Sequence, residues 1–383
     1  MDEALRWLHA QRTEVLRLLR ALVEASSHTG DKAGVDAAGA LLREAVALDC
    51  EVARSERFGD HLFFHNERAA GAPGVVIVGH VDTVFPREVF AGFSVEGEVA
   101  RGPGVLDMKG GLVVVAFALE ALRRAGLLEG LPVTFAVVSD EEVGSPESAA
   151  LLRNVARGAA CALVFEAGRK GDAIITRRKG TGSVTIDARG RAAHAGLAHH
   201  EGANALWSLA RWIDRVQSLT DYAHGVTVNV GRVEGGIGKN TVPDRARAEA
   251  DFRYVRRVDG ASIEDAMRCL ARESAVEGTT LTMSGGVARA PLERTPESAS
   301  LCARYALCQR AAGLGDGEAG LQGGGSDAST TAAVGVPSID GLGPRGEGFH
   351  TTQEYVEIGS FAPKAEALVR FLCGLRETYA AEG

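Results

Sequence analysis

Cysteine is scarce in this chain, and its cysteines are never closely paired. Six cysteines are scattered over 383 residues, and no two of them form a Cys-x-x-Cys motif. This usage argues against a disulfide framework and against a zinc site made of thiolates. We therefore expect reduced, buried thiols and a cytoplasmic location.

Long apolar segments and an excess of positive charge are also missing. The longest apolar stretch, 111–119, is too short to cross a bilayer, and the first residues lack the pattern of a secretory signal. A net charge of −8 and a pI near 5.8 argue against a surface for nucleic acid or anionic membranes. With 45% hydrophobic and 24% charged residues, the chain is typical of a soluble globular protein of two or three domains.

Apolar, β-branched runs alternate with amphipathic segments in the first half and at the end of the chain. Strands are expected at 74–79, 131–138 and 161–165, and helices at 3–24, 33–48, 108–125, 296–312 and 360–379. Strands that alternate with helices through short loops predict an α/β/α layered domain with a mainly parallel sheet.

Residues 179–288 follow a different pattern. The expected order is strand, helix, strand, strand, helix, strand, which is a ferredoxin-like (βαββαβ) arrangement with two helices on one face of a sheet. The α/β pattern resumes afterwards. We therefore expect an inserted domain at 179–288 within a discontinuous domain made of 1–178 and 289–383.

Side chains that can bind metals follow the three apolar strands. They are His80 and Asp82 after the first strand, Glu141 and Glu142 after the second, and Glu166 after the third. Each has a structural explanation when taken alone: a core histidine followed by a helix-capping aspartate, or a solvated acidic loop. Because parallel strands end at the same edge of a sheet, where α/β proteins bind ligands, together they indicate one site.

Two more candidates lie in glycine-rich loops. Asp107 precedes a buried helix, where it could be only the N-cap, and His350 lies in Gly348-Phe349-His350-Thr351. Two histidines and several carboxylates without a thiolate suit zinc, with cobalt or manganese as substitutes. Neighbouring side chains on an extended backbone point in opposite directions. One of Glu141 and Glu142 can therefore bind metal while the other faces water and substrate.

With their flanking residues, these motifs resemble the M20 family of dinuclear zinc hydrolases, and most of all its glutamate carboxypeptidase (carboxypeptidase G2) branch. The matching stretches are Gly79-His80-Val81-Asp82-Thr83, Asp107-Met108-Lys109-Gly110-Gly111, Asp140-Glu141-Glu142-Val143-Gly144-Ser145, Phe165-Glu166 and Phe349-His350. The resemblance implies two zinc ions per subunit. It implies that Asp107 bridges both ions, that His80 and Glu166 complete one site, and that Glu142 and His350 complete the other. Glu141 would be the general base, and Asp82 would orient His80.

The inserted domain carries a second set of matching motifs. They are Gly190-Arg191-Ala192-Ala193-His194-Ala195-Gly196, Gly238-Lys239-Asn240-Thr241-Val242-Pro243 and Asp251-Phe252-Arg253-Tyr254. The resemblance implies a lid that dimerises, with His194 donating to the oxyanion in the partner subunit's active site. Asn240 and Arg253 would bind the carboxylate end of the substrate. Without the resemblance, His194 is a polar loop residue and Arg253 belongs to a surface ion pair.

The residues that select the substrate are less well defined. The resemblance implies that the loop 323–327 lies by the substrate, with Gly325 in contact. A glutamate-selective relative is expected to place a cation near 169–176, but alignment puts Ile174 there and leaves Arg289 as another basic contact. A C-terminal glutamate and an apolar side chain both stay open.

These features predict a homodimeric, metal-dependent amidohydrolase that acts on a small molecule. It would cleave the amide next to a free α-carboxylate and release a C-terminal amino acid from an N-acyl amino acid or short peptide. The alternative within enzymes is an N-acyl-amino-acid deacylase of the acetylornithine, succinyl-diaminopimelate or aminoacylase type. The alternative of another class is a metal-free binding protein on the same fold. No nucleic-acid or membrane partner is expected.

Overall fold

The computed structural model describes residues 1–66 and 74–382, and the chain divides into two compact units. The first unit consists of 1–177, 294–321 and 326–383, and the second consists of 178–293 and 322–325. The segment expected to be inserted, 179–288, lies within the second unit.

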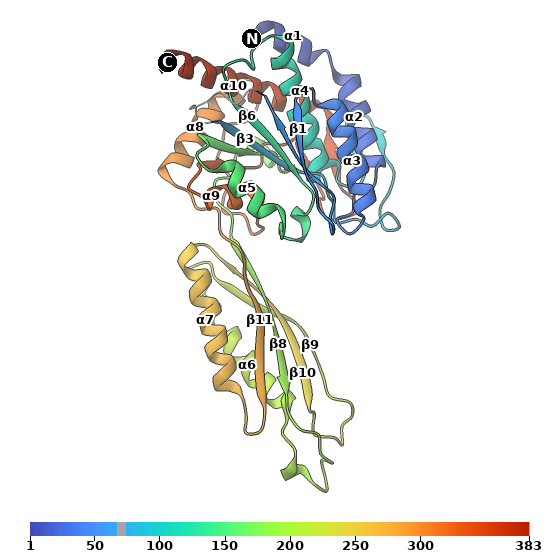
Figure 1. Ribbon diagram of the computed structural model, residues 1–383, viewed down its shortest axis with the longest axis vertical. Coiled ribbons are helices and arrows are strands. Elements are labelled where there is room, and N and C mark those ends of the chain that lie inside the picture. The colour runs from blue at the N-terminus through green and yellow to red at the C-terminus, as the bar shows by residue number, and fades with distance from the viewer. Residues whose placement is uncertain (67–73, 383) are drawn as a thin grey trace. The chain divides into compact units, whose positions relative to one another are not determined.

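A six-stranded sheet forms the centre of the first unit, in the order β1-β2-β6-β3-β7-β12 (Figure 1). The strands are β1 (Asp49–Ala53), β2 (His61–His65), β3 (Val75–His80), β6 (Val133–Val138), β7 (Cys161–Val164) and β12 (Ser338–Ile339). Strands β6, β3, β7 and β12 run parallel to one another. β2 is antiparallel to both of its neighbours, β1 and β6. Every residue of β3 is buried, as expected for a strand covered on both faces.

Helices cover the two faces of this sheet, which gives the expected α/β/α layers. On one face α4 (Gly110–Arg124) contacts β3 and packs against α10 (Phe361–Glu382), α1 (Asp2–His9) and α2 (Arg12–Glu24). On the other, α9 (Asp327–Ala332) contacts β3 and β7 beside α5 (Ser148–Ala156) (Figure 1). The remaining helices are α3 (Lys32–Ala45), which packs on α2, and α8 (Pro296–Ala311), which packs on α10 and β12.

The single helix expected over 3–24 is wrong, because the chain breaks between α1 and α2. α1 ends at His9, and the side chain of Gln11 donates to the carbonyl of Trp7 at 3.1 Å. A side chain that bonds a nearby carbonyl competes with the backbone bond that would continue the helix. The apolar faces of the two helices share one periodicity, so the pattern alone did not reveal the break.

A separate sheet of four short strands occupies segments for which no strands were expected. Its order is β13-β14-β5-β4, formed by β4 (Ser94–Glu96), β5 (Val99–Arg101), β13 (Gly346–Glu347) and β14 (Tyr355–Glu357). Strands of two or three residues are too short to show a periodic pattern. This sheet joins the segment after His350 to the loop that leads to Asp107.

The second unit has the expected ferredoxin-like architecture. Its antiparallel sheet has the order β11-β8-β10-β9, from β8 (Gly180–Arg189), β9 (Thr227–Gly235), β10 (Arg245–Tyr254) and β11 (Thr280–Arg289). Helices α6 (Ala205–Gln217) and α7 (Arg257–Ser274) pack on this sheet and on each other. Short helical turns complete the chain: η1 (Val105–Lys109), η2 (Glu141–Val143), η3 (Lys170–Asp172), η4 (His199–Glu201) and η5 (Ile358–Ser360).

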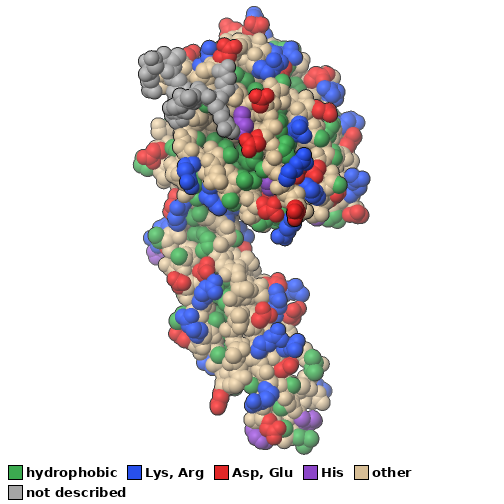
Figure 2. Space-filling model, in the orientation of Figure 1, with side chains coloured by type: hydrophobic (Ala, Val, Ile, Leu, Met, Phe, Trp, Pro, Cys, Tyr) green, Lys and Arg blue, Asp and Glu red, His purple; other side chains and the backbone are tan. Residues whose placement is uncertain are grey.

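The surface shown in Figure 2 carries charged side chains of both signs. Acidic and basic side chains are interspersed over the face shown in Figure 2. Within the described ranges, none of the helices has the length and apolar character needed to span a bilayer.

Candidate metal centre

The carboxyl ends of β3, β6 and β7 bring four of the predicted side chains to one edge of the sheet. His80 is the last residue of β3, and Glu166 lies two residues beyond the end of β7. Glu141 and Glu142 follow β6 in the 3-10 turn η2, not on the extended backbone that the sequence suggested. The turn forms because Gly144 has a left-handed backbone (φ 92°) and Ser145 N–H donates back to the carbonyl of Asp140 at 2.9 Å.

Asp107 reaches the same edge from the loop before α4. The helix lies close to the end of β7, because a Cβ on Gly111 would be 2.0 Å from the carbonyl oxygen of Phe165. Only glycine allows this approach. The Asp107–Met108 peptide bond is cis. The alternative that Asp107 is merely an N-cap is wrong, since Lys109 occupies the cap position and no side chain caps the helix.

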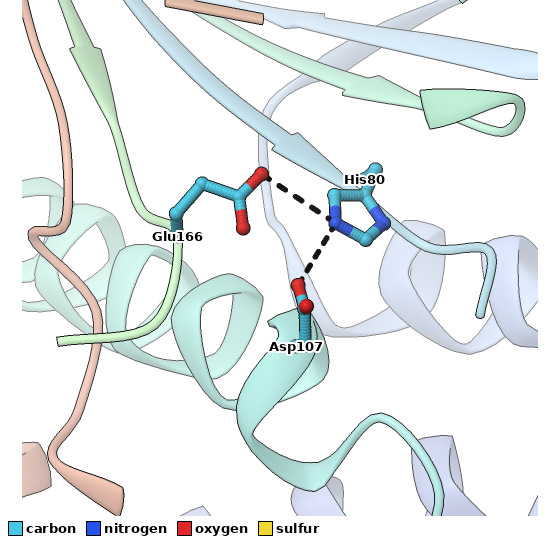
Figure 3. A group of neighbouring side chains, drawn as sticks. All are labelled: His80, Asp107 and Glu166. Carbon is cyan, nitrogen blue, oxygen red and sulfur yellow. Dashed lines mark ion pairs between the residues drawn. The ribbon is translucent and has the colours of Figure 1, made fainter. Parts of the chain in front are cut away.

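The first cluster consists of His80, Asp107 and Glu166 (Figure 3). His80 Nε2 lies 3.3 Å from Asp107 Oδ1 and 3.6 Å from Glu166 Oε1. The imidazole is only 1% exposed, so its position is fixed by packing. One nitrogen and two carboxylates thus converge from three separate elements.

The second cluster consists of Asp107, Glu142 and His350. His350 Nε2 lies 3.3 Å from Asp107 Oδ2 and 3.2 Å from Glu142 Oε2. Asp107 therefore offers one oxygen to each cluster. In each group the candidate ligand atoms all lie within 4.8 Å of one another. Nitrogen and oxygen donors without sulfur fit zinc, cobalt or manganese, so the residues suit a pair of divalent cations that share one carboxylate.

Asp82 holds this edge together in a way that the sequence did not predict. His80 Nδ1 is closer to the backbone carbonyl of Asp82, at 3.0 Å, than to its carboxylate, at 3.4 Å. The carboxylate accepts the backbone N–H groups of Glu141 (3.3 Å) and Glu142 (3.2 Å) and the hydroxyl of Thr29 (2.7 Å). Asp82 therefore contacts His80 through both its main chain and its carboxylate, and the carboxylate also positions the Glu141–Glu142 turn.

Glu141 directly precedes Glu142 in the η2 turn, and its charge acts on both clusters. Its negative charge helps to raise the pKa values of Glu142 and Glu166, one from each cluster. Glu141 itself belongs to neither of the two groups of candidate ligands. A carboxylate beside two cation sites but outside their ligand sets suits the role of a base.

When no cation neutralises them, four of the five side chains of the clusters have raised pKa values, and only that of Asp107 is lowered. Burial, reinforced by the charges of Asp107 and Glu141, raises the pKa of Glu142 to about 7 although His350 opposes this. Burial and the charge of Asp107 raise the pKa of Glu166 to about 8. Bonds to Asp107 and Glu142 raise the pKa of His350 to about 10. Burial opposes the charged forms of Asp107 and His80. Bonds to His350 and His80 nevertheless hold the pKa of Asp107 below its usual range, and the charge of Glu166 with a bond to Asp107 holds the pKa of His80 well above its usual value.

Cation binding should therefore release protons. Ligands bind metals in their deprotonated forms, and Glu142 and Glu166 have pKa values of about 7 and about 8. Lowering the pH through this range protonates them, so we expect zinc or cobalt affinity to fall as the pH falls from 8 to 6. Calorimetric titration at pH 7 in buffers of different ionisation enthalpy should detect the released protons. Heats that do not depend on the buffer would contradict these protonation states.

Two buried charged residues of this region were missed by sequence reasoning. Glu354 is 0% exposed, and its carboxylate accepts the backbone N–H groups of Gly104, Leu106 and Asp107. Burial raises its pKa to about 7 although these bonds oppose the shift. Lys109 is equally buried, and burial lowers its pKa to about 7 against the charges of Glu354 and Asp82. The available signals were a lysine at the start of an apolar helix and a glutamate four residues after His350.

In the second unit, the structure brings the loops of His194 and Asn240 together. Ala195 N–H donates to the carbonyl of Asn240 at 2.9 Å, and His194 pairs with Thr241 in an isolated bridge. His194 is exposed, and its Nδ1 accepts the N–H groups of Gly196 (3.1 Å) and Leu197 (3.2 Å). The ring proton of a neutral His194 is then on Nε2, which can donate to a ligand.

The other predicted substrate contacts have mixed outcomes. Arg253 Nε donates to Asp251 Oδ1 at 2.7 Å on β10, which is the ion pair considered as its alternative role. Arg289 is buried against Gly325, whose Cβ, if present, would be 2.9 Å from Arg289 Cδ. Ile174, which alignment puts where a cation was expected, belongs to the main hydrophobic core and is 0% exposed, so its side chain does not reach the surface of the described structure.

Comparisons with known proteins agree with both units. Residues 176–279 match the family model of the M20 peptidase dimerisation domain. The chain is 29% identical to carboxypeptidase G2 of Pseudomonas sp. (strain RS-16) over 374 residues, which cover 95% of this chain and 90% of that protein. It is 26% identical to succinyl-diaminopimelate desuccinylase of Xanthomonas oryzae pv. oryzae (strain PXO99A), covering 90% of this chain and 94% of the other.

A solved structure extends the similarity to the fold. The YXEP protein of Bacillus subtilis, a dinuclear metal-binding peptidase of the M20 family, superposes with a TM-score of 0.72 at 14% identity. The superposition covers 97% of this chain and 99% of that one. Both units of the chain therefore have counterparts in a single known architecture.

Proposed function

The chain belongs to the M20 peptidase family and is a hydrolase of peptide or amide bonds, and from this premise we propose a specific reaction. It cleaves the amide next to a free α-carboxylate and releases a C-terminal amino acid from an N-acyl amino acid or short peptide. Two divalent cations, zinc in our proposal, are held by His80, Asp107 and Glu166 and by Asp107, Glu142 and His350. The observation that carries this proposal is that Asp107 offers a separate oxygen to each cluster.

The catalytic residues act at the boundary between the two clusters. When bound, the cations polarise the scissile carbonyl and lower the pKa of a water molecule. Glu141 accepts the proton of the attacking water and passes it to the leaving nitrogen. The N–H bonds from Glu141 and Glu142 to Asp82 fix the turn that carries this base. His80 is held through its Nδ1 by the main chain of the same aspartate.

The second unit supplies the remaining groups in a homodimer. His194 donates from Nε2 to the oxyanion in the partner subunit's site, and Asn240 and Arg253 bind the α-carboxylate. Support for a dimer comes from the match to a dimerisation domain and from apolar side chains exposed on the unit. Trp207 on α6 is 60% exposed, and Val233 on the edge strand β9 is 50% exposed.

A free α-carboxylate on the substrate should be required. We expect an N-acyl amino acid to have a kcat/KM roughly 10- to 100-fold higher than its C-terminal amide, because bonds to a charged group contribute about 1.5–3 kcal/mol. Arg253→Ala should remove most of this preference, with hydrolysis of both compounds measured side by side. Arg247→Ala, on the same strand and in a surface ion pair, is the matched control.

Two results would contradict this prediction. An Arg253→Ala protein that keeps the wild-type ratio of acid to amide would exclude Arg253 as the carboxylate contact. Equal activity of wild-type protein on both compounds would remove the requirement for the α-carboxylate.

The N-acyl-amino-acid deacylase is the second candidate, favoured by the similarity to succinyl-diaminopimelate desuccinylase. Both candidates release an amino acid and differ in the acyl part that is removed. A panel that varies the acyl group at a fixed amino acid, and then the amino acid at a fixed acyl group, distinguishes them. The metal-free binding protein is no longer supported, since the chain belongs to a family of hydrolases.

A further inference from the structure

Glu354 is a buried carboxylate that binds the backbone of the loop that carries Asp107. Its Oε1 accepts the N–H groups of Leu106 at 2.9 Å and Asp107 at 2.8 Å, and its Oε2 accepts that of Gly104 at 2.9 Å. Three such bonds leave this short loop little freedom, and one of them ends on Asp107 itself. We name this arrangement the carboxylate clamp.

A buried lysine provides the opposite charge. Lys109 is 0% exposed, and its Nζ has no hydrogen-bond partner within the described part of the chain. The charges that act on it are those of Glu354 and Asp82. Buried charges are costly unless an opposite charge compensates them, and the charge of Glu354 stabilises the charged form of Lys109.

The clamp is tied to the second histidine of the metal centre through a compact turn. Thr351 N–H donates to the carbonyl of Gly348 at 3.0 Å, and Glu354 N–H donates to the carbonyl of Thr351 at 3.2 Å. His350 lies within this turn with a left-handed backbone (φ 62°). Directly after it, β14 pairs with β5. The segment 348–354 therefore carries His350 and, through Glu354, also binds the backbone of the loop that carries Asp107.

We propose that Glu354 is a positioning residue that sets the separation between Asp107 and His350 and thereby forms the second cation site. Glu354 belongs to neither group of candidate ligands and acts through the backbone N–H groups of Gly104, Leu106 and Asp107. Asp107 is also fixed from the other side by His80, whereas His350 is 52% exposed and depends more on its own segment. Loss of the clamp should therefore weaken the cluster of His350 more than the cluster of His80. This inference rests on the dinuclear site proposed above.

Stepwise cobalt titration of the metal-free protein, followed by visible absorption, tests the clamp. Glu354→Gln keeps the size of the side chain but replaces one acceptor oxygen with an amide NH₂. We expect the weaker-binding ion to lose roughly 10- to 100-fold in affinity, as when other residues that orient metal ligands are changed, with a smaller effect on the first ion. Glu357→Gln is the matched control, because Glu357 lies three residues further on and pairs with Arg345.

A second variant keeps the test valid if Glu354→Gln does not fold. Combining Lys109→Met with Glu354→Gln removes both buried charges, and this protein should fold with the same selective loss of one ion. Glu354→Asp, which keeps the charge on a shorter side chain, should recover part of the affinity. Folded variants that bind both ions with wild-type affinity would overturn the clamp. Wild-type protein that binds fewer than two ions would overturn the dinuclear site and, with it, this inference.

Discussion

Replacing Glu141 by glutamine is expected to lower kcat by roughly 10²- to 10⁴-fold, the usual contribution of a general base. Glutamine keeps the shape of the side chain but cannot accept the proton of the attacking water. Glu141 is in neither group of candidate ligands, so the variant should bind metal as the wild type does. Steady-state kinetics and metal analysis of the same sample provide the measurement.

Glu147→Gln is the control for this change. Glu147 is exposed and lies six residues after Glu141, and its backbone N–H donates to Asp140 Oδ2 at 2.8 Å. Its replacement should leave kcat unchanged. If Glu141→Gln keeps its activity, Glu141 is not the base. If it loses a cation together with its activity, Glu141 acts as a ligand.

Asp107→Asn is expected to have the largest effect on metal content. An amide supplies only one good acceptor oxygen, whereas the two clusters use separate oxygens of Asp107. Both ions should bind more weakly, and kcat/KM should fall roughly 10³-fold or more, since metal-assisted charge stabilisation contributes several kcal/mol. Metal content after dialysis and kcat/KM at a fixed concentration of free zinc measure the two effects.

His350→Ala provides the contrast with Asp107→Asn. His350 belongs to one cluster only, so its removal should lower metal content to about one ion per chain. Asp36→Asn, in a surface ion pair with Lys32, controls for the loss of a carboxylate elsewhere. Equal metal loss in the Asp107 and His350 variants would contradict the shared carboxylate. Full metal content in both would exclude these residues as ligands.

Three residues of the candidate metal clusters could be found from the sequence because they follow strong local signals. The apolar run of β3 places His80 at the carboxyl end of a central strand, and the runs of β6 and β7 do the same for Glu142 and Glu166. The edge of a parallel sheet then brings these residues together without any knowledge of tertiary contacts. Asp107 and His350 have no such signal, since both lie in loops, and the family resemblance supplied their roles.

Contacts between distant segments could not be predicted from the sequence. The carboxylate of Asp82 binds the turn of Glu141 and Glu142, about 60 residues away, and Glu354 binds a loop about 250 residues away. The short strands β5 and β14 position that loop. Each has only three residues, which is too short for a recognisable alternation of apolar and polar residues. Alignment suggested that Ile174 lies near the substrate, but an aligned position does not tell whether a side chain is buried. In each case the role of the residue depends on side chains and backbone groups from distant parts of the sequence, which a local pattern does not reveal.

Titration of metal-free wild-type protein with zinc, followed by hydrolysis of an N-acyl amino acid, tests the dinuclear hydrolase most directly. Two groups of ligands that share Asp107 predict that activity rises to a plateau at two equivalents per chain. The metal-free protein should have almost no activity. A plateau at one equivalent, or full activity without added metal, would contradict the dinuclear site.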